Sequence, residues 1–308
     1  MNNKDVFFNF EDETYGNISI GKIPSHLHNN TKYIQNNFYK NMNENCKKKT
    51  SYHEWYNNIS PNMKKKIDEI IEDNFWKENI CNLNKCKLIR IKEMDEIYYA
   101  NPPKKLTKNL YGAIGNYGVH TDGFLKFKDI NVYRVLIGLT DGNDNMTYFT
   151  DHGYGKLINK NEYVLFDFDK SKHQVLINND GNKSKYRLIL KLHFLVCKGN
   201  YSDFYINFLI KYYSNYLKLT RYVQENGTNP KTLKGFFFGV ISSIIGTDYN
   251  ILLSIFVFFI LLFIFYIIEK NKKLSNIIYK TLLSELSIFI LIIIYNYFSF
   301  LMLKNNME

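Results

Sequence analysis

The chain has 308 residues and a formal net charge of +11, from 40 Lys and Arg against 29 Asp and Glu. Two uncharged runs, Ile251–Ile268 and Leu286–Leu303, are each long enough to span a bilayer core, which argues against a wholly soluble protein. Lysines are scattered through Asn-rich stretches without a basic helix that carries interleaved aromatics, so we expect no nucleic-acid partner. The excess charge is better explained by biased composition and a mild attraction to anionic lipid headgroups.

Residues 1–107 are predicted to form an N-terminal α/β flanking region. Ser60 and Pro61 suit the cap and the first position of a helix, and Ile67, Ile70 and Phe75 recur after them at helical spacing. The stretch 87–91 alternates apolar and polar residues as a strand does.

The chain has four cysteines and begins without an apolar secretory segment. None of the cysteines forms a Cys-x-x-Cys pair, and their spacing does not match the usual zinc patterns: Cys46, Cys81, Cys86 and Cys197. We therefore expect reduced thiols in a domain that faces the cytosol.

Residues 108–198 contain short β-like runs separated by turn signals, without the alternation of strands and helices typical of a dinucleotide-binding fold. The expected strands are 133–137, 147–149, 163–166, 174–177 and 186–194. Closely spaced strands of this kind predict a sandwich or barrel, including the double-sheet jelly roll. We expect a mainly β catalytic core with flanking helices.

The C-terminal part is predicted to be helical. Residues 199–248 form a Tyr-rich connector, and 249–304 form two transmembrane helices, so the protein is expected in a membrane as a two-helix hairpin. Lys270, Lys272 and Lys273 lie between the two runs and would place that segment in the cytosol. Translocation of the whole N-terminal part without a signal is difficult, however, so we expect both termini and the catalytic domain in the cytosol.

One group of residues predicts metal chemistry. His120 and Asp122 form a His-x-Asp pair after a β-like segment, and His173 follows at the start of another strand. Two histidines and one carboxylate on one face of a metal form the facial triad of non-haem Fe(II) oxygenases, which leaves positions open for a co-substrate and dioxygen. His152 is the alternative second histidine, although it follows His120 closely for the intervening strands.

Arg187 is predicted to bind the distal carboxylate of a dicarboxylate co-substrate, because a guanidinium pairs with a carboxylate through two parallel hydrogen bonds. His193 falls on the same strand face and could line the site, although a position on its polar rim is favoured. The hydroxyl of Tyr133 could also contact the co-substrate. The alternative for Tyr133 is an aromatic side chain that only packs within a strand.

With these residues, the chain resembles the 2-oxoglutarate/Fe(II)-dependent dioxygenases, of the prolyl-hydroxylase-like and aspartyl/asparaginyl β-hydroxylase-like types. The resemblance lies in Gly118–Gly123, Tyr133–Leu139, Leu165–Asp167 with His173–Val175, and Arg187–Leu190, and it covers about residues 108–198. It implies a double-stranded β-helix (jelly-roll) core, Fe(II) bound by His120, Asp122 and His173, and 2-oxoglutarate and dioxygen as co-substrates. Ascorbate is an optional reductant.

The chain departs from the family's pattern in two respects. The Asp122 carboxylate departs from the aspartyl/asparaginyl β-hydroxylase-like type, whose best-known members lack it, and is more similar to the prolyl-hydroxylase type. Arg187 lies farther from His173 than the family's basic residue commonly does, so Lys183 or Lys185 remains an alternative ligand for 2-oxoglutarate. The resemblance implies hydroxylation of a protein side chain (Pro, Lys, Asp or Asn). The predicted membrane attachment through residues 249–304 suggests a lipid or lipid-linked substrate as an alternative. The third possibility is a non-catalytic, membrane-tethered jelly-roll binding protein.

Overall fold

The structure is a computed structural model that describes residues 18–47, 51–81, 86–100, 119–123, 129–141, 145–177 and 186–227, and a few positions between 276 and 287. The chain divides into two compact units, residues 1–218 and 219–308. All the strands described below belong to the first unit, and so do the residues of the candidate site.

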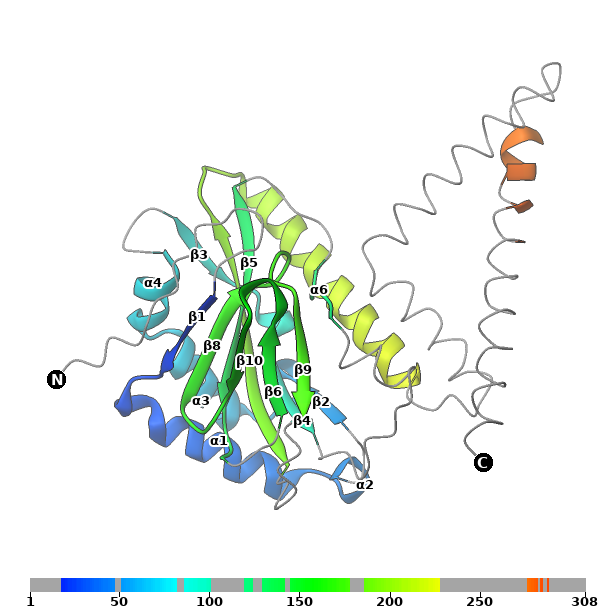
Figure 1. Cartoon of the computed structure of the whole chain (residues 1–308). Helices are drawn as coiled ribbons and strands as arrows, with labels where there is room; N and C mark the ends of the chain where they lie inside the picture. Colours follow the sequence, from blue (N-terminus) through cyan, green and yellow to red (C-terminus); the bar gives the residue numbers. More distant parts are fainter. Residues whose placement is uncertain are drawn as a thin grey trace, which may run out of the picture. The chain divides into compact units, whose positions relative to one another are not determined.

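Two antiparallel sheets form the first unit (Figure 1). The large sheet has the order β1-β8-β5-β10-β4-β2, with β3 also paired to β10, and the small sheet has the order β7-β6-β9. The strands are β1 (Ile18–Lys22), β2 (Ser51–Trp55), β3 (Lys87–Arg90), β4 (Glu96–Ala100), β5 (Ile130–Gly138), β6 (Asn145–Phe149), β7 (Tyr154–Leu157), β8 (Glu162–Asp167), β9 (His173–Ile177) and β10 (Arg187–Cys197).

The helices flank these sheets. They are α1 (His28–Asn41), α2 (Glu44–Lys47), α3 (Pro61–Ile71), α4 (Asn74–Cys81) and α6 (Asp203–Gly227), with short 3-10 turns η1 (Ser25–Leu27), η2 (Tyr56–Asn58), η3 (Lys92–Met94) and η4 (Thr150–His152). The predicted start of α3 is confirmed: the Ser60 hydroxyl accepts a hydrogen bond from the Met63 backbone N–H, and Pro61 takes the first helical position.

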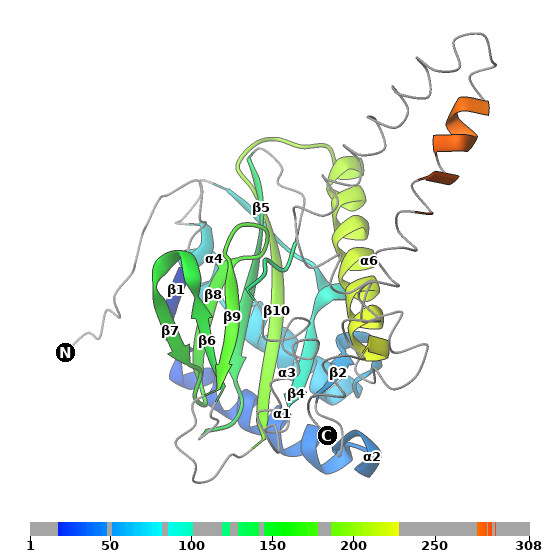
Figure 2. The ribbon, with the colours of Figure 1, turned by 45° about the vertical axis from the view of Figure 1, so that its right-hand side comes forward.

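The two faces of the large sheet are covered differently. On one face, Val135 and Leu190 join a hydrophobic cluster with Ile34 of α1 and Ile67 of α3. On the other face, a second cluster joins the two sheets: Ile18, Leu136, Phe149, Ile158, Val164, Phe166 and Ile189. Figure 2 shows the β7-β6-β9 sheet on one side of the large sheet and α3 on the other. We call these the inner face and the helix face; the two packed sheets are consistent with the predicted jelly roll.

The expected strands between 133 and 194 correspond to β5, β6, β8, β9 and β10. The N-terminal part does more than flank them, because β1 pairs with β8 and β4 pairs with β10 in one continuous sheet. The predicted boundary at residue 107 therefore separates strands that share hydrogen bonds across the same sheet.

Two further expectations concern the cysteines and the membrane. Cys81 and Cys86 form a disulfide, so the expectation of reduced thiols is wrong for this pair, whose α-carbons lie 5.4 Å apart; Cys46 and Cys197 are free thiols. Among the helices that the structure describes, none is long and apolar enough to cross a bilayer. The two runs predicted to do so lie almost wholly outside the described residues.

Candidate metal centre

The two predicted histidine ligands lie side by side because their backbones pair. The His120 N–H donates to the His173 carbonyl at 3.0 Å, and the His173 N–H donates to the His120 carbonyl at 2.9 Å. This isolated antiparallel bridge connects the His-x-Asp segment to the first residue of β9. Residues 53 positions apart in the sequence thus present neighbouring imidazoles, with ring centres 4.6 Å apart.

A tight turn after β8 fixes the third ligand. The Asp167 carboxylate accepts the backbone N–H groups of Asp169 and Lys170 and so holds the turn in place. The Phe168 carbonyl then accepts from the N–H groups of Asp122 (3.1 Å) and Gly123 (2.9 Å). A side chain at Gly123 would meet the Asp169 carboxylate, because a Cβ there would lie 1.9 Å from Oδ1. Glycine is therefore required for this close approach.

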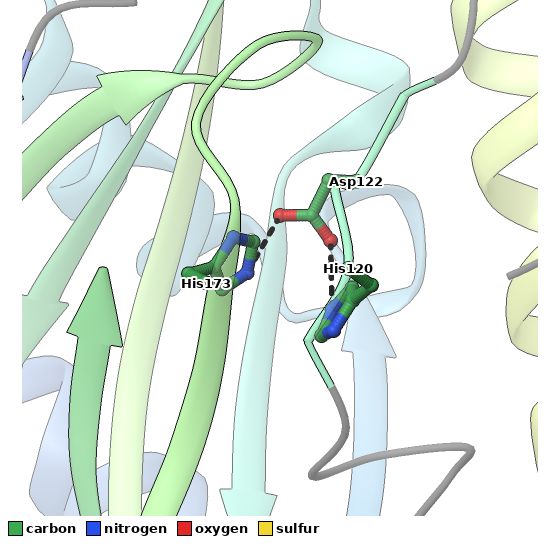
Figure 3. A group of neighbouring side chains, drawn as sticks. All are labelled: His120, Asp122 and His173. Carbon is green, nitrogen blue, oxygen red and sulfur yellow. Dashed lines mark ion pairs between the residues drawn. The ribbon is translucent and has the colours of Figure 1, made fainter. Parts of the chain in front are cut away.

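The three side chains converge, as Figure 3 shows. His120 Nε2 lies 3.9 Å from Asp122 Oδ1, and His173 Nε2 lies 3.4 Å from Asp122 Oδ2. One ligand atom from each residue lies within 4.8 Å of the other two, which is close enough for a single metal ion to bind all three. Two imidazole nitrogens and a carboxylate oxygen suit divalent iron and leave the remaining coordination positions open.

The environment of His173 keeps its imidazole neutral. The pKa of His173 is lowered to about 4, mainly by burial; the Asp122 carboxylate opposes the shift, and His120 and Arg134 act in the same direction as burial. Nδ1 lies 3.1 Å from the Ser171 carbonyl oxygen, which accepts a hydrogen bond from Nδ1–H in this tautomer. This hydrogen bond leaves Nε2, on the side of Asp122, as the nitrogen available to a metal.

Three buried cationic side chains project from the inner face, and one of them, Arg134, contacts the triad. Arg134 forms an ion pair with Asp122, and Lys191 forms one with Glu96 at 2.9 Å. Arg187, which is 4% exposed, donates from Nη2 to the Thr147 hydroxyl at 3.1 Å. The Arg187 guanidinium would bind a carboxylate more strongly than it binds the Thr147 hydroxyl, because a hydrogen bond between two charged groups is stronger than one to a neutral group.

The register of the small sheet places Arg187 near the triad. Phe149 pairs with His173, and Thr147 pairs with Val175, two residues farther along β9. Two residues of strand correspond to roughly 7 Å. A five-carbon dicarboxylate with one end at the metal could therefore reach Arg187 with the other. Lys183 and Lys185, the alternatives to Arg187, lie outside the described residues.

The other candidates are placed away from the triad or in a different role. Tyr133 belongs to the hydrophobic cluster of the helix face, with Val135 and Phe194, so the structure supports the packing alternative over contact with a co-substrate. His152 lies in η4 and is not part of the group that His173 completes. His193 was expected on a polar rim, but its side chain is fully buried.

Sequence reasoning missed the role of Arg134, which contacts both a predicted ligand and His193. Its signal was a single Arg within the apolar strand Tyr133–Leu139. A lone charge in such a strand is normally expected to face solvent, and its inward direction depends on the pairing of β5 with β10.

No protein-family model and no curated protein sequence matches this chain. The solved structures similar to it include a viral collagen prolyl hydroxylase from Paramecium bursaria Chlorella virus-1 in complex with 2-oxoglutarate, at 12% identity over 58% of this chain and 95% of that one, with a TM-score of 0.36. A prolyl 4-hydroxylase from Phytophthora capsici is 11% identical over 73% and 76%, with a TM-score of 0.39.

HygX from Streptomyces hygroscopicus, solved with nickel and 2-oxoglutarate, is 7% identical over 59% of this chain and 83% of that one, with a TM-score of 0.38. The first two of these proteins are named as prolyl hydroxylases, one of the enzyme types that the sequence of this chain resembles.

Proposed function

We propose that this protein is an Fe(II)- and 2-oxoglutarate-dependent dioxygenase. The observation that carries the proposal is the convergence of His120, Asp122 and His173, which offer one ligand atom each within 4.8 Å of one another at the edge of a β sandwich. The donor set is that of the non-haem iron oxygenases, and the buried, neutral state of His173 suits metal binding, which requires a deprotonated imidazole.

Each neighbouring side chain has a definable part in this chemistry. When bound, the iron would supply the activation of dioxygen, coupled to conversion of 2-oxoglutarate to succinate and carbon dioxide. Arg187 would bind the distal carboxylate of 2-oxoglutarate and so orient it. Phe149 and Phe166 each lie within 6 Å of the His173 ring, measured between ring centres, and exclude water from that side of the site.

We further propose a protein side chain as the substrate, on the basis of the sequence resemblance to prolyl and aspartyl/asparaginyl hydroxylases. A lipid or lipid-linked molecule is the enzymatic alternative. The three described ligands leave coordination positions open, as a catalytic metal requires, whereas the metal of a structural site in a non-catalytic protein is usually fully coordinated by side chains. The geometry therefore favours an enzyme over a scaffold.

Membrane attachment through residues 249–304 is part of the proposal and rests on the two uncharged runs. We expected the catalytic domain to face the cytosol. The Cys81–Cys86 disulfide favours the opposite orientation, because structural disulfides persist in oxidising compartments. The Lys-rich segment between the runs also favours it. Protease protection of an N-terminal tag in sealed vesicles distinguishes the two orientations.

The activity is tested by release of carbon dioxide from carboxyl-labelled 2-oxoglutarate, with the purified full-length chain and a panel of peptides and lipids. We expect release that requires Fe(II) and falls to the iron-free level in Asp122→Ala. Glu78→Ala, which changes an exposed carboxylate on α4, is the matched control and should retain the wild-type rate. Equal rates in wild type and Asp122→Ala would contradict the proposed function.

A further inference from the structure

Arg134 is held by three different partners. Its Nε donates to His193 Nε2 at 2.8 Å, its Nη1 forms an ion pair with Asp122 Oδ2, and its guanidinium carbon lies 4.6 Å from the centre of the Phe168 ring. Its side chain is 3% exposed. A planar guanidinium with a fixed fork of donors can satisfy two such acceptors and stack on a ring at once, which the ammonium group of lysine cannot do.

His193 is a neutral acceptor for Arg134. Because Nε2 accepts the hydrogen bond from Arg134, the ring proton belongs on Nδ1, which lies 3.6 Å from Asp95 Oδ1. The His193 backbone N–H donates to the same carboxylate at 2.9 Å. Burial and the adjacent guanidinium lower the pKa of His193 well below its ordinary value, in agreement with a neutral ring.

A second ion pair anchors this arrangement on the far side. Arg90 donates to Asp95 Oδ2 from Nε and to Asp68 Oδ1 from Nη1, both at 2.6 Å. A continuous line of polar contacts therefore runs from Asp68, which is partly exposed, to the metal ligand Asp122. The position of the Arg134 guanidinium is thus set by residues from β3, β10 and the loop before β4.

The two oxygens of Asp122 have different surroundings. Oδ2 is the atom that Arg134 contacts, and it also lies 3.4 Å from His173 Nε2, whereas Oδ1 lies 3.9 Å from His120 Nε2 and is not the atom paired with Arg134. A carboxylate whose one oxygen is held by a guanidinium presents the other oxygen to a cation. If both oxygens bound the metal, the carboxylate would occupy one of the positions that the two-histidine, one-carboxylate site must leave open for a chelating co-substrate.

We infer that Arg134, oriented by His193, is a positioning residue that keeps Asp122 a ligand through one oxygen and so preserves the open positions for 2-oxoglutarate. The inference rests on the proposed function. It extends that function to residues outside the triad, because neither Arg134 nor His193 contributes a ligand atom to the group of three. Outer-shell partners of this kind typically change affinity by about 10- to 100-fold when they are replaced.

The test uses the purified full-length chain loaded with Co(II), whose absorption spectrum reports the number and kind of its ligands, and titrated with 2-oxoglutarate. His193→Leu removes the acceptor of Arg134, and His193→Gln retains an acceptor oxygen. We expect His193→Leu and Arg134→Met to change the Co(II) spectrum before 2-oxoglutarate is added and to weaken 2-oxoglutarate binding by about tenfold or more. His193→Gln should restore both towards the wild type.

A purely structural role for His193 would lower stability without this pattern. If folded His193→Leu and His193→Gln give the same Co(II) spectrum and the same 2-oxoglutarate affinity as the wild type, the inference is wrong. The comparison of His193→Leu with His193→Gln tests the inference even if Arg134→Met does not fold. The wild type should give a Co(II) spectrum that is lost in His120→Ala. If it does not, the proposed function is wrong, and this failure is distinguishable from failure of the inference about Arg134.

Discussion

The two faces of β10 are buried to the same extent, but they differ in chemistry. On the helix face, Leu188, Leu190 and Leu192 pack against other apolar side chains. On the inner face, the alternate positions carry Arg187, Lys191 and His193 beside the apolar Ile189, each less than 9% exposed. One strand thus serves as hydrophobic core on one side and as the support of a charged site on the other.

The difference between the two faces of β10 separates residues that stabilise the fold, on the helix face, from residues that support the candidate site, on the inner face. The free energy gained on the helix face comes from removal of apolar surface from water, roughly 25 cal/mol per Å². The inner face also buries apolar side chains, among them Leu136 and Ile189, but it adds charged side chains, and burial of an unpartnered charge is costly. Its side chains are accommodated because they have polar partners, such as Glu96 for Lys191 and Thr147 for Arg187. We expect substitutions on the two faces to have separable effects.

The largest expected separation is between His173→Ala and Leu190→Ala. His173→Ala removes a ligand of the metal, so we expect Fe(II)-dependent release of carbon dioxide from 2-oxoglutarate to fall to background in a folded protein. Leu190→Ala creates a cavity in the helix-face cluster and should lower the free energy of unfolding by about 2–5 kcal/mol. Denaturant melts and turnover of both variants check this, and equal loss of activity in a folded Leu190→Ala would break the separation.

His173 should make a separable contribution to the pH dependence of stability. Its folded-state pKa is about 4, below the ordinary 6.5, so the unfolded chain binds a proton over a range of pH where the folded chain does not. The contribution of His173 to the free energy of unfolding of the metal-free protein should therefore fall as pH decreases from 6.5 to 4, by at most about 3 kcal/mol.

The comparison with His173→Gln isolates this contribution. Asp95, whose pKa burial raises to about 7, has the opposite effect, because its protonated form is favoured in the folded state and stability falls as pH rises from about 4 to 7. Subtraction of the variant's stability from that of the wild type at each pH removes the Asp95 term. A difference that is flat between pH 6.5 and 4 would rule out a neutral His173.

Arg187→Met tests the inner face against Tyr133→Phe on the helix face. Loss of a charge-assisted contact to the distal carboxylate should raise the KM for 2-oxoglutarate by about 10- to 100-fold, with a smaller effect on kcat. Tyr133→Phe should leave this KM unchanged, since Tyr133 packs with the helix-face cluster. An unchanged KM in Arg187→Met would instead point to Lys183 or Lys185.

Gly123→Ala is expected to give the smallest of these effects, about 1–3 kcal/mol in the free energy of unfolding, because the new Cβ would displace the Asp169 carboxylate. The Asp169 carboxylate also accepts the Tyr213 hydroxyl at 2.9 Å, so the displacement would disturb the contact of the turn with α6. In the double variant Gly123→Ala/Asp169→Ala the two costs should not add, which a double-mutant cycle measures. Full additivity would mean that the close contact is not the cause.

The parts of the molecule that local sequence could specify were predicted. The cap at Ser60 and the alternation in β10 depend on neighbouring residues, and both appear in the structure. The approach of His120 to His173 was expected from residue type and order, although the backbone bridge that creates it was not. Short strands with weak alternation, such as β1 and β2, were missed because their pairing partners lie far away in the sequence.

The remaining differences have a common physical cause. His193 was expected at a polar rim because a charged or polar residue on an alternating strand normally marks a solvent-facing side. Here the His193 side chain is covered by Arg134, the Phe168 ring and Asp95, and the polar residues on this side of β10 contact polar partners. The Cys81–Cys86 pair was missed for a similar reason, since its spacing fits no metal pattern and a disulfide depends on backbone proximity.

The most direct test of the account is a crystal structure of the full-length chain with Mn(II) and 2-oxoglutarate, with the metal located by its anomalous scattering. We predict one ion bound by Nε2 of His120, one carboxylate oxygen of Asp122 and Nε2 of His173, with the distal carboxylate of 2-oxoglutarate against Arg187. A metal bound elsewhere, or a 2-oxoglutarate that makes no contact with the inner face, would contradict the account.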